Sequence, residues 1–394
     1  MSSRRRLRGD SDGRVPESNV NDIWMLASGP TAVEGGNSES KCDLDSPEGE
    51  AGHDSKAGVT LLKQHETYTL FVGQKQSGKS TLITAFHNPT KEDIPKPTVA
   101  LEYLFARRST ATNKPKDVAH IWELGGGLTL SNLISVPITP LTIRKAVVAI
   151  VVDLSQPNNL VHSLSQWLQI LRIRGDECLS DIRATDPALA DAINRVAASK
   201  FREDHPDKMA VRPLPMSTLI VANKLDVFRE QDQVQKKAVY QMLRFVAHLH
   251  GATLLTVGAK DKTSQNNLRT HLTSLLFSGS GGKAYRKEVA LEKPMAVPAG
   301  SDSFEDILKA GLPPTKMFSL STADFIDPRS GRATEDALPN WGRVLEDFFG
   351  AAAPGEEDMP ASATQGRIDI VSVFMKSKLS CCLLKLSLFA MIFY

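Results

Sequence analysis

The sequence contains few cysteines, and they form no recognisable pattern. Cys42, Cys178, Cys381 and Cys382 are the only four among 394 residues. Their spacing suits neither a zinc site with histidine ligands nor the dense disulfide framework of a small secreted domain. The N-terminal segment also lacks the apolar core of a secretory signal. These absences predict a reducing compartment, the cytoplasm.

A dominant charge and a long uncharged apolar run are missing as well. The chain has 47 Lys and Arg against 45 Asp and Glu, a net charge of +2, so there is no electrostatic argument for nucleic acid as a main partner. Residues 379–394 are apolar but short for a membrane-spanning helix, and Lys385 interrupts them. We expect no transmembrane segment. A lipidated or interfacial anchor and an atypical terminus are the alternatives for this end.

The length suits one domain of about 200 to 250 residues with a tail at each end. Residues 1–58 are rich in Ser, Gly, Asp and Glu and poor in large apolar side chains, which predicts a disordered N-terminal arm. We place the globular domain at 59–280 and an irregular C-terminal tail at 281–394. Within this tail, residues 339–349 have an apolar stripe at helical spacing, which either packs on the domain or binds a partner.

The strongest motif lies in residues 68–81, YTLFVGQKQSGKST. An apolar strand pattern ends in G-x-x-x-x-G-K-S, and a helical pattern follows, which is the context of a phosphate-binding loop rather than of a chance glycine-rich turn. The glycines allow the backbone N–H groups to turn toward phosphate oxygens, and the helix directs its positive end at the same anion. Lys79 would reach the β- and γ-phosphates, and Ser80 would ligate Mg²⁺. The predicted nucleotide-binding residues of this loop are Gly73, Gln74, Lys75, Gln76, Ser77, Gly78, Lys79, Ser80 and Thr81.

A second set of residues predicts which base the site reads. Asn223, Lys224 and Asp226 follow a buried strand as N-K-x-D, where Ras-like GTPases recognise guanine. The aspartate accepts from N1–H and the exocyclic amine of guanine, and adenine lacks this pair of donors. Ala259 and Lys260 follow the next strand and partly match the loop that contacts the base. We therefore expect GTP or GDP, with Mg²⁺, as the cofactor.

Apolar stretches of strand length alternate with helical stripes between residues 66 and 280. Residues 146–154, AVVAIVVDL, are apolar without alternation, as in a central strand covered on both faces. The expected strands are 68–73, 98–107, 117–124, 146–154, 217–222 and 253–257, and the expected helices are one starting near Lys79, 160–171 with helical character continuing to 200, 234–250 and 268–277. Strands 98–107 and 117–124 read as a hairpin. The alternation predicts an α/β protein with a Ras-like P-loop NTPase fold, a mostly parallel central sheet with helices on both faces.

Two positions differ from those of a working GTPase. Glu123 stands where such proteins have the aspartate of Asp-x-x-Gly, and Gly127 stands where they have the glutamine that orients the attacking water. Thr98 is the candidate for the threonine that senses the γ-phosphate, so Ser80, Thr98 and Glu123 are the candidate magnesium residues. We expect no catalytic residues, and hydrolysis no faster than the order of 10⁻⁴ s⁻¹ of an unassisted Ras-type site.

The remaining candidates have ordinary interpretations. His120, His248 and His250 have no cysteine or carboxylate constellation in the sequence, so packing or solvent exposure is expected rather than catalysis or metal binding. Trp122 is expected in the core rather than as a stacking platform.

Several long strings resemble the dynein light intermediate chains. They are KPTVALEY at 96–103, NKPKDVAHIWELGGG at 113–127, ISVPIT at 134–139, DHPD at 204–207 and LRFVAH at 243–248. The resemblance covers about residues 66–350 and is nearest to the light intermediate chains of the cytoplasmic dynein that drives retrograde intraflagellar transport.

This resemblance implies a non-catalytic subunit that binds the dynein heavy chain and the other subunits of the complex, while the motor ATPase resides in the heavy chain. It implies indirect contact with microtubules, association with intraflagellar transport trains, and a role in cilium or flagellum assembly. The implied locations are the cytoplasm, the cytoskeleton and the cilium or flagellum, with its axoneme and basal body. The alternative is a cycling Ras-like signalling GTPase, against which Gly127 argues. A motor in its own right is disfavoured, because the sequence has no second phosphate loop.

Overall fold

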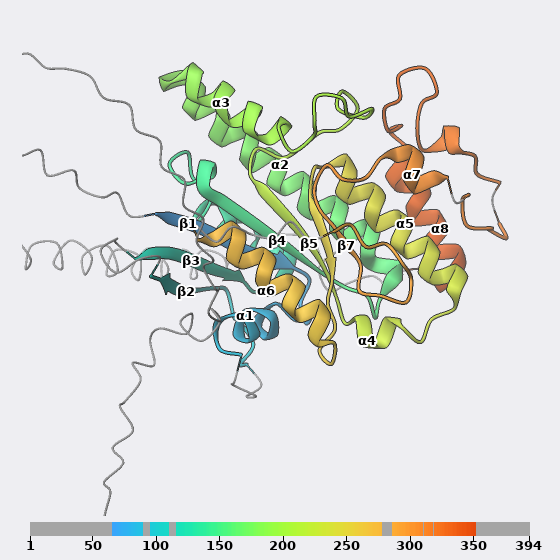
Figure 1. Cartoon of the computed structure of the whole chain (residues 1–394), viewed down its shortest axis with the longest axis horizontal. Helices are drawn as coiled ribbons and strands as arrows, with labels where there is room; N and C mark the ends of the chain where they lie inside the picture. The colour runs from blue at the N-terminus through green and yellow to red at the C-terminus, as the bar shows by residue number, and fades with distance from the viewer. Residues whose placement is uncertain are drawn as a thin grey trace, which may run out of the picture.

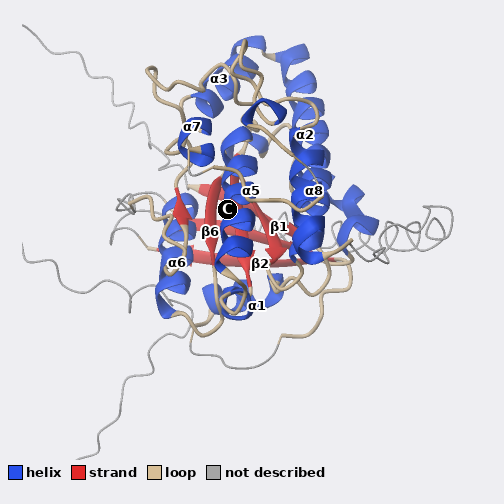
Figure 2. Ribbon diagram, turned by 90° about the vertical axis from the view of Figure 1, so that its right-hand side faces the viewer, coloured by secondary structure: helices blue, strands red, loops and turns tan. Residues whose placement is uncertain are grey.

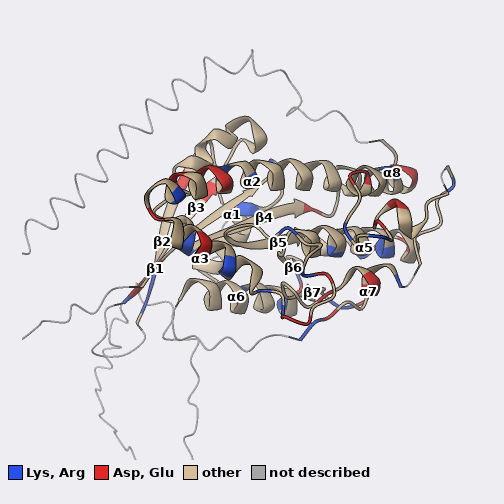
Figure 3. Ribbon diagram, turned by 90° about the horizontal axis from the view of Figure 1, so that it is seen from above, with Lys and Arg blue, Asp and Glu red and all other residues tan. Residues whose placement is uncertain are grey.

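The computed structural model describes residues 65–89, 95–109, 116–277, 286–309, 311–317 and 319–351 (Figure 1). The expected N-terminal arm at 1–58, most of the hairpin connection after residue 109 and the apolar segment 379–394 lie outside these residues. No helix in the described ranges combines the length and apolar character needed to cross a membrane. Figure 3 shows basic and acidic residues interspersed along the ribbon.

A seven-stranded sheet organises the domain, with strand order β2-β3-β1-β4-β5-β6-β7. The strands are β1 (Glu66–Gly73), β2 (Leu101–Arg108), β3 (Asp117–Leu124), β4 (Ala146–Asp153), β5 (Ser217–Asn223), β6 (Thr253–Thr256) and β7 (Ala296–Val297). The sheet is parallel through the five strands β3, β1, β4, β5 and β6. At its two edges, β2 and β7 pair antiparallel to their neighbours. The predicted α/β class and mostly parallel sheet are confirmed.

Helices cover both faces of this sheet (Figure 2). The α-helices are α1 (Lys79–His87), α2 (Leu160–Thr185), α3 (Pro187–Ala198), α4 (Leu225–Phe228), α5 (Gln233–Leu249), α6 (Lys262–Leu276), α7 (Phe304–Leu308) and α8 (Ala337–Phe349), and the 3₁₀ helices are η2 (Gly127–Ser135), η3 (Ile143–Lys145), η4 (Pro157–Asn159) and η5 (Thr322–Asp324). Apolar residues of α1 and α6 pack on one face, and those of α2, α5, α7 and α8 pack on the other.

Strand β4 lies at the centre because both of its faces are apolar. All eight of its residues are buried, between β1 and β5. Trp167 and Leu168 of α2 are also fully enclosed, on the same side as Val148 and Ile150. Burial of each such aliphatic side chain stabilises the fold by roughly 1.5 to 3 kcal/mol, so the uninterrupted run read from the sequence fixes the middle of the sheet.

The segment beyond residue 280 contributes to the same core. Strand β7 pairs with β6, and Trp341 of α8 is fully buried against Phe325 and Phe245, with ring centroids 4.8 Å and 6.0 Å away. The sequence predicts a domain that ends at residue 280, but β7 and α8 lie beyond this point and pack on the same domain. Strand β7 has only two residues, so its sequence shows no alternation of apolar and polar side chains. The apolar stripe of α8 packs against α2 and α5 of its own domain (Figure 1).

Candidate nucleotide-binding site

The loop between β1 and α1 requires its glycines. Gly73 has φ of 143° and Gly78 has φ of 93°, both in the region that favours glycine. A Cβ on Gly73 would lie 2.1 Å from the carbonyl oxygen of Val151, and one on Gly78 would lie 2.2 Å from Nδ2 of Asn223. The motif therefore folds as the predicted turn between a strand and a helix, wedged against β4 and β5.

Lys79 is held across this loop. Its side chain is buried, and its Nζ donates to the carbonyl oxygens of Gly73 at 2.9 Å and Gln74 at 2.7 Å. Lys79 is also the first residue of α1, so the loop has the positive end of the helix at its close and the ammonium group at its start. A buried cation beside helix N–H groups is an arrangement suited to bind phosphate oxygens.

The N-K-x-D residues join this loop to the ends of β4 and β6. Asn223 donates from Nδ2 to the carbonyl oxygen of Ser77 at 2.9 Å. Lys224 has a left-handed backbone, with φ of 62°, and its Nζ forms an ion pair with Asp153 at 2.5 Å. Asp226 accepts from the backbone N–H of Lys260 at 3.2 Å. Four segments distant in the sequence thus meet at the carboxyl ends of parallel strands, where ligands bind in open α/β sheets.

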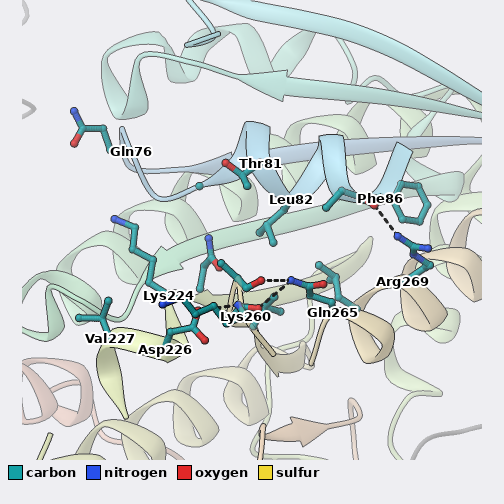
Figure 4. A pocket seen from close by; sticks show the side chains of 17 residues that line it. Gln76, Thr81, Leu82, Phe86, Lys224, Asp226, Val227, Lys260, Gln265 and Arg269 are labelled. Carbon is teal, nitrogen blue, oxygen red and sulfur yellow. Dashed lines mark hydrogen bonds between the residues drawn. The ribbon is translucent and has the colours of Figure 1, made fainter. Parts of the chain in front are cut away.

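A cavity of about 520 Å³ lies between these segments and α1 (Figure 4). Of the predicted residues, those that line it are Gln76, Gly78, Thr81, Asn223, Lys224, Asp226, Ala259 and Lys260. Figure 4 shows Thr81 and Leu82 of α1 on one side and Lys224, Asp226 and Lys260 on the other. Gly73, Gln74, Lys75, Ser77, Lys79 and Ser80 belong to the adjoining loop and do not line the cavity.

Two residues that the motifs do not include hold the loop after β6. Gln265 donates from Nε2 to the carbonyl oxygens of Ala259 at 2.6 Å and Gly258 at 3.3 Å. Ser264 accepts from the backbone N–H of Gly258 at 3.1 Å. Both lie in the first turns of α6, which begins at Lys262 rather than at the predicted residue 268. The helix starts early because Asp261 caps it by accepting from the N–H groups of Thr263 and Ser264.

The three candidate magnesium residues come from α1, β3 and the segment before β2. Ser80 donates from Oγ to Oε1 of Glu123 at 2.6 Å, and a Cβ on Gly125 would lie 2.2 Å from the carbonyl oxygen of Thr98. Burial raises the pKa of Glu123, and the hydrogen bond from Ser80 and the charge of Lys79 offset this only in part. Hydroxyl and carboxylate oxygens suit Mg²⁺, but the direct contact leaves no room for a water between Glu123 and Ser80.

The position after β3 that would orient an attacking water has backbone angles that favour glycine. Gly126 and Gly127 have φ of 72° and 61°, and Gly127 is buried at the start of η2. Glycine adopts such angles freely, whereas a residue with a side chain adopts them at a cost of about 1 to 2 kcal/mol, as Gln76 and Lys224 do elsewhere in this domain. The backbone of this turn therefore favours glycine over the glutamine of a working GTPase.

One histidine interpretation needs correction. His248 does have a carboxylate partner, because its Nε2 lies 2.9 Å from Oδ2 of Asp207, which also accepts from the N–H of Phe304. His205 completes a cluster whose ligand-type atoms lie within 4.8 Å of one another. Both nitrogens of His205 are engaged, however, with the N–H of Asp207 and the carbonyl oxygen of Asp302. The cluster is thus a hydrogen-bonded tie between α5 and the segments at 205–207 and 302–304, which the sequence spacing does not reveal.

The other residues behave as packing groups. His120 stacks between Tyr68 and Tyr103, with ring centroids 4.9 Å and 5.9 Å away. His250 is half-buried, and desolvation, with the nearby charges of Arg172 and Arg212, lowers its pKa to about 3. Trp122 is half-buried against the core, as expected.

The succession of a phosphate-type loop after β1 and an N-K-x-D turn after β5, on a mostly parallel sheet, defines the domain as a Ras-like P-loop fold. Residues 60–190 match the family model described as dynein light intermediate chain (DLIC). The chain is 32% identical over 337 residues to "Cytoplasmic dynein 2 light intermediate chain 1" of Danio rerio, with 85% of each chain covered. The protein belongs to the dynein light intermediate chain family.

Two further relatives match smaller shares of this chain. The human "Cytoplasmic dynein 2 light intermediate chain 1" is 35% identical over 284 residues, which cover 72% of this chain and 76% of the human one. "Cytoplasmic dynein 1 light intermediate chain 1" of Dictyostelium discoideum is 32% identical over only 102 residues, 25% of this chain and 20% of that one. Among solved structures, the "Crystal Structure of the Dynein Light Intermediate Chain's Conserved Domain" aligns with a TM-score of 0.49 and 15% identity, covering 75% of this chain and 95% of that one.

Proposed function

We propose that this protein is a non-catalytic light intermediate chain of a cytoplasmic dynein 2 motor. In this role it binds the heavy chain and the other subunits of the complex and supports retrograde intraflagellar transport and the assembly of cilia or flagella. The observation that carries the proposal is the 32% identity to the Danio rerio protein over 85% of both chains. ATP hydrolysis and force would come from the heavy chain.

The partners and location follow from the same proposal. The chain would reach microtubules only through the motor complex and would travel with intraflagellar transport trains. It would occur in the cytoplasm, at the basal body and along the axoneme, as part of the cytoskeleton. Association with a dynein heavy chain in ciliated or flagellated cells tests this role.

The second part of the proposal is that the domain holds GTP or GDP. The loop from Gly73 to Thr81 would bind the phosphates, with Lys79 supplying the charge, and Ser80 with Glu123 would hold Mg²⁺. Asp226, facing the cavity beside Ala259 and Lys260, would read the guanine edge. What supports this is that hydrogen bonds already fix each of these groups at one end of the sheet.

A cycling signalling GTPase is the alternative, and the rate of hydrolysis separates the two. We expect single-turnover hydrolysis of bound GTP no faster than about 10⁻⁴ s⁻¹, the order of an unassisted Ras-type site. The reason is that Gly127 offers no side chain to orient water, and its backbone has φ of 61°. Quenched samples of the full chain loaded with radiolabelled GTP, compared with Lys79→Ala as background, measure this rate. Turnover well above that limit would favour the signalling role.

A further inference from the structure

The centre of the edge strand β2 is apolar and exposed, whereas charged side chains commonly protect the edge strands of natural sheets. Among the described residues β2 is the terminal strand of the sheet, beyond β3 (Figure 1). Tyr103, Leu104 and Phe105 at its centre are 43%, 38% and 49% exposed, and no charged residue interrupts the run from Tyr103 to Ala106. A long, regular, apolar edge is a template for pairing with another strand.

The backbone of β2 has a defined outward side. The N–H of Gly125 donates to the carbonyl oxygen of Ala100, and the register continues from Leu101 opposite Leu124. Because hydrogen-bonded and non-hydrogen-bonded residues alternate in an antiparallel ladder, the even-numbered residues of β2 direct their backbone groups at β3. Those of Leu101, Phe105 and the other odd-numbered residues point away from the sheet.

The charges at the two ends of β2 are opposite in sign, and the basic end lies opposite an acid across the ladder, Asp117 opposite Arg108. Glu102 lies opposite another acid, Glu123. The Cζ atom of Arg108 lies 6.0 Å from the ring centroid of Phe277, and its Nη1 is buried without an acceptor among the described residues. Arg107 lies over the ring of Phe105, with Cζ 5.1 Å from the centroid. The strand thus presents an acid at its start and bases at its end.

We propose that β2 is a docking strand for β2 of a second copy of this chain, paired antiparallel about Phe105. A two-fold axis at Phe105 sets Glu102 opposite Arg108 of the copy, Tyr103 opposite Arg107 and Leu104 opposite Ala106. Each cross-strand pair is then an ion pair, an aromatic–cation pair or an apolar pair, and each occurs twice. Glu102 gains the basic neighbour that it lacks in its own sheet, and the outward backbone groups pair with their equivalents.

Edge pairing of one strand buries little surface, so the contact is expected to be weak, with association in the micromolar range. Sedimentation equilibrium of the full-length chain from about 1 to 100 µM measures it. We expect a monomer–dimer equilibrium that Glu102→Arg or Arg108→Glu weakens about tenfold, because each change replaces both cross-strand ion pairs by pairs of like charge. The double variant with both changes is expected to restore the dimer, because it exchanges the two charges. Val196→Lys, an exposed site on α3, is the matched control and is expected to leave the dimer unchanged.

Cysteine crosslinking tests the register. In a full-length chain carrying Cys42→Ser, Cys381→Ser and Cys382→Ser, Phe105→Cys is expected to form an intermolecular disulfide on mild oxidation. In the proposed dimer Phe105 lies opposite Phe105 of the second copy in a hydrogen-bonded pair. The Cα atoms of such a pair are about 5.5 Å apart, within the range that a disulfide spans. Leu104→Cys, also exposed but displaced from its own copy beyond ~7 Å, is expected not to crosslink.

Three outcomes would overturn the proposal. One is a monomer at every concentration, with equal crosslinking of the Leu104→Cys and Phe105→Cys variants. Another is crosslinking at Leu104→Cys alone, which requires a different register. The third is capture of Phe105→Cys by another protein of the cell, or by Cys381 or Cys382 when these are retained, with no disulfide between copies. In that case the edge serves a different occupant.

Discussion

Lys79→Ala is expected to lower the affinity for GTP and GDP about 100-fold. The Nζ of Lys79 lies at the loop, bound to the carbonyl oxygens of Gly73 and Gln74, and Lys79 is buried there. Loss of charge-assisted hydrogen bonds to phosphate costs about 3 kcal/mol, which corresponds to that factor. Titration of the full-length chain with a fluorescent guanine nucleotide measures the change.

The matched control for this substitution is Lys262→Ala. Lys262 is an exposed lysine at the first position of α6, outside the cavity lining, so its loss is expected to leave the affinity unchanged. Thermal unfolding without nucleotide checks that both variants are folded. Equal affinities of wild type and a folded Lys79→Ala variant would show that the loop does not bind phosphate.

Trp341→Ala is expected to destabilise the whole domain by about 3 to 5 kcal/mol, the usual cost of emptying a buried aromatic site. Trp341 is fully buried and contacts the rings of Phe245 from α5 and Phe325, so its removal opens a cavity in the larger core. For a domain of this size the midpoint of thermal unfolding should fall by roughly 6 to 20 °C. Differential scanning calorimetry of the full chain measures both quantities.

An exposed position on the same helix provides the comparison. Glu346 lies on the solvent side of α8, and Glu346→Ala is expected to change stability by less than ~0.5 kcal/mol. If Trp341→Ala were as mild as Glu346→Ala, or if α8 melted separately from the sheet, residues 296–349 would not share the core of the domain.

The centre of the fold could be predicted because its signals are local. The unbroken apolar run of β4 predicts burial on both faces, and all eight residues are buried. The G-x-x-x-x-G-K-S spacing between a strand and a helix likewise predicts the loop at Gly73–Ser80, whose glycines take the positive φ values that the motif requires. Each of these signals comes from one contiguous stretch of chain, so no knowledge of tertiary contacts is needed.

The parts that could not be predicted depend on contacts between distant residues. The two-residue strand β7 exists only because β6 is beside it. The pairing of His248 with Asp207 joins residues 41 positions apart, and neither residue stands in a metal-ligand spacing. Gln265 likewise has no motif, since its role comes from reaching back to the carbonyl oxygen of Ala259.

The early start of α6 was, in contrast, open to prediction. Asp261 followed by Lys262 and Thr263 is an N-cap signal before a helical pattern, and its carboxylate accepts two backbone N–H groups in the structure. The prediction of 268 came from weighing the apolar stripe alone, because the polar first turn of α6 carries few apolar residues. Capping residues thus locate a helix start that periodicity misses.

The central claim is that the chain is a heavy-chain-bound subunit that holds a guanine nucleotide without turning it over. The most direct measurement is purification of the tagged full-length chain, at native abundance, from ciliated or flagellated cells. Mass spectrometry quantifies the co-purified proteins, and chromatography of the released nucleotide quantifies GTP and GDP in the same sample. The account predicts a cytoplasmic dynein 2 heavy chain and guanine nucleotide, each in near-stoichiometric amount. A preparation that repeatedly contains no dynein heavy chain would contradict it.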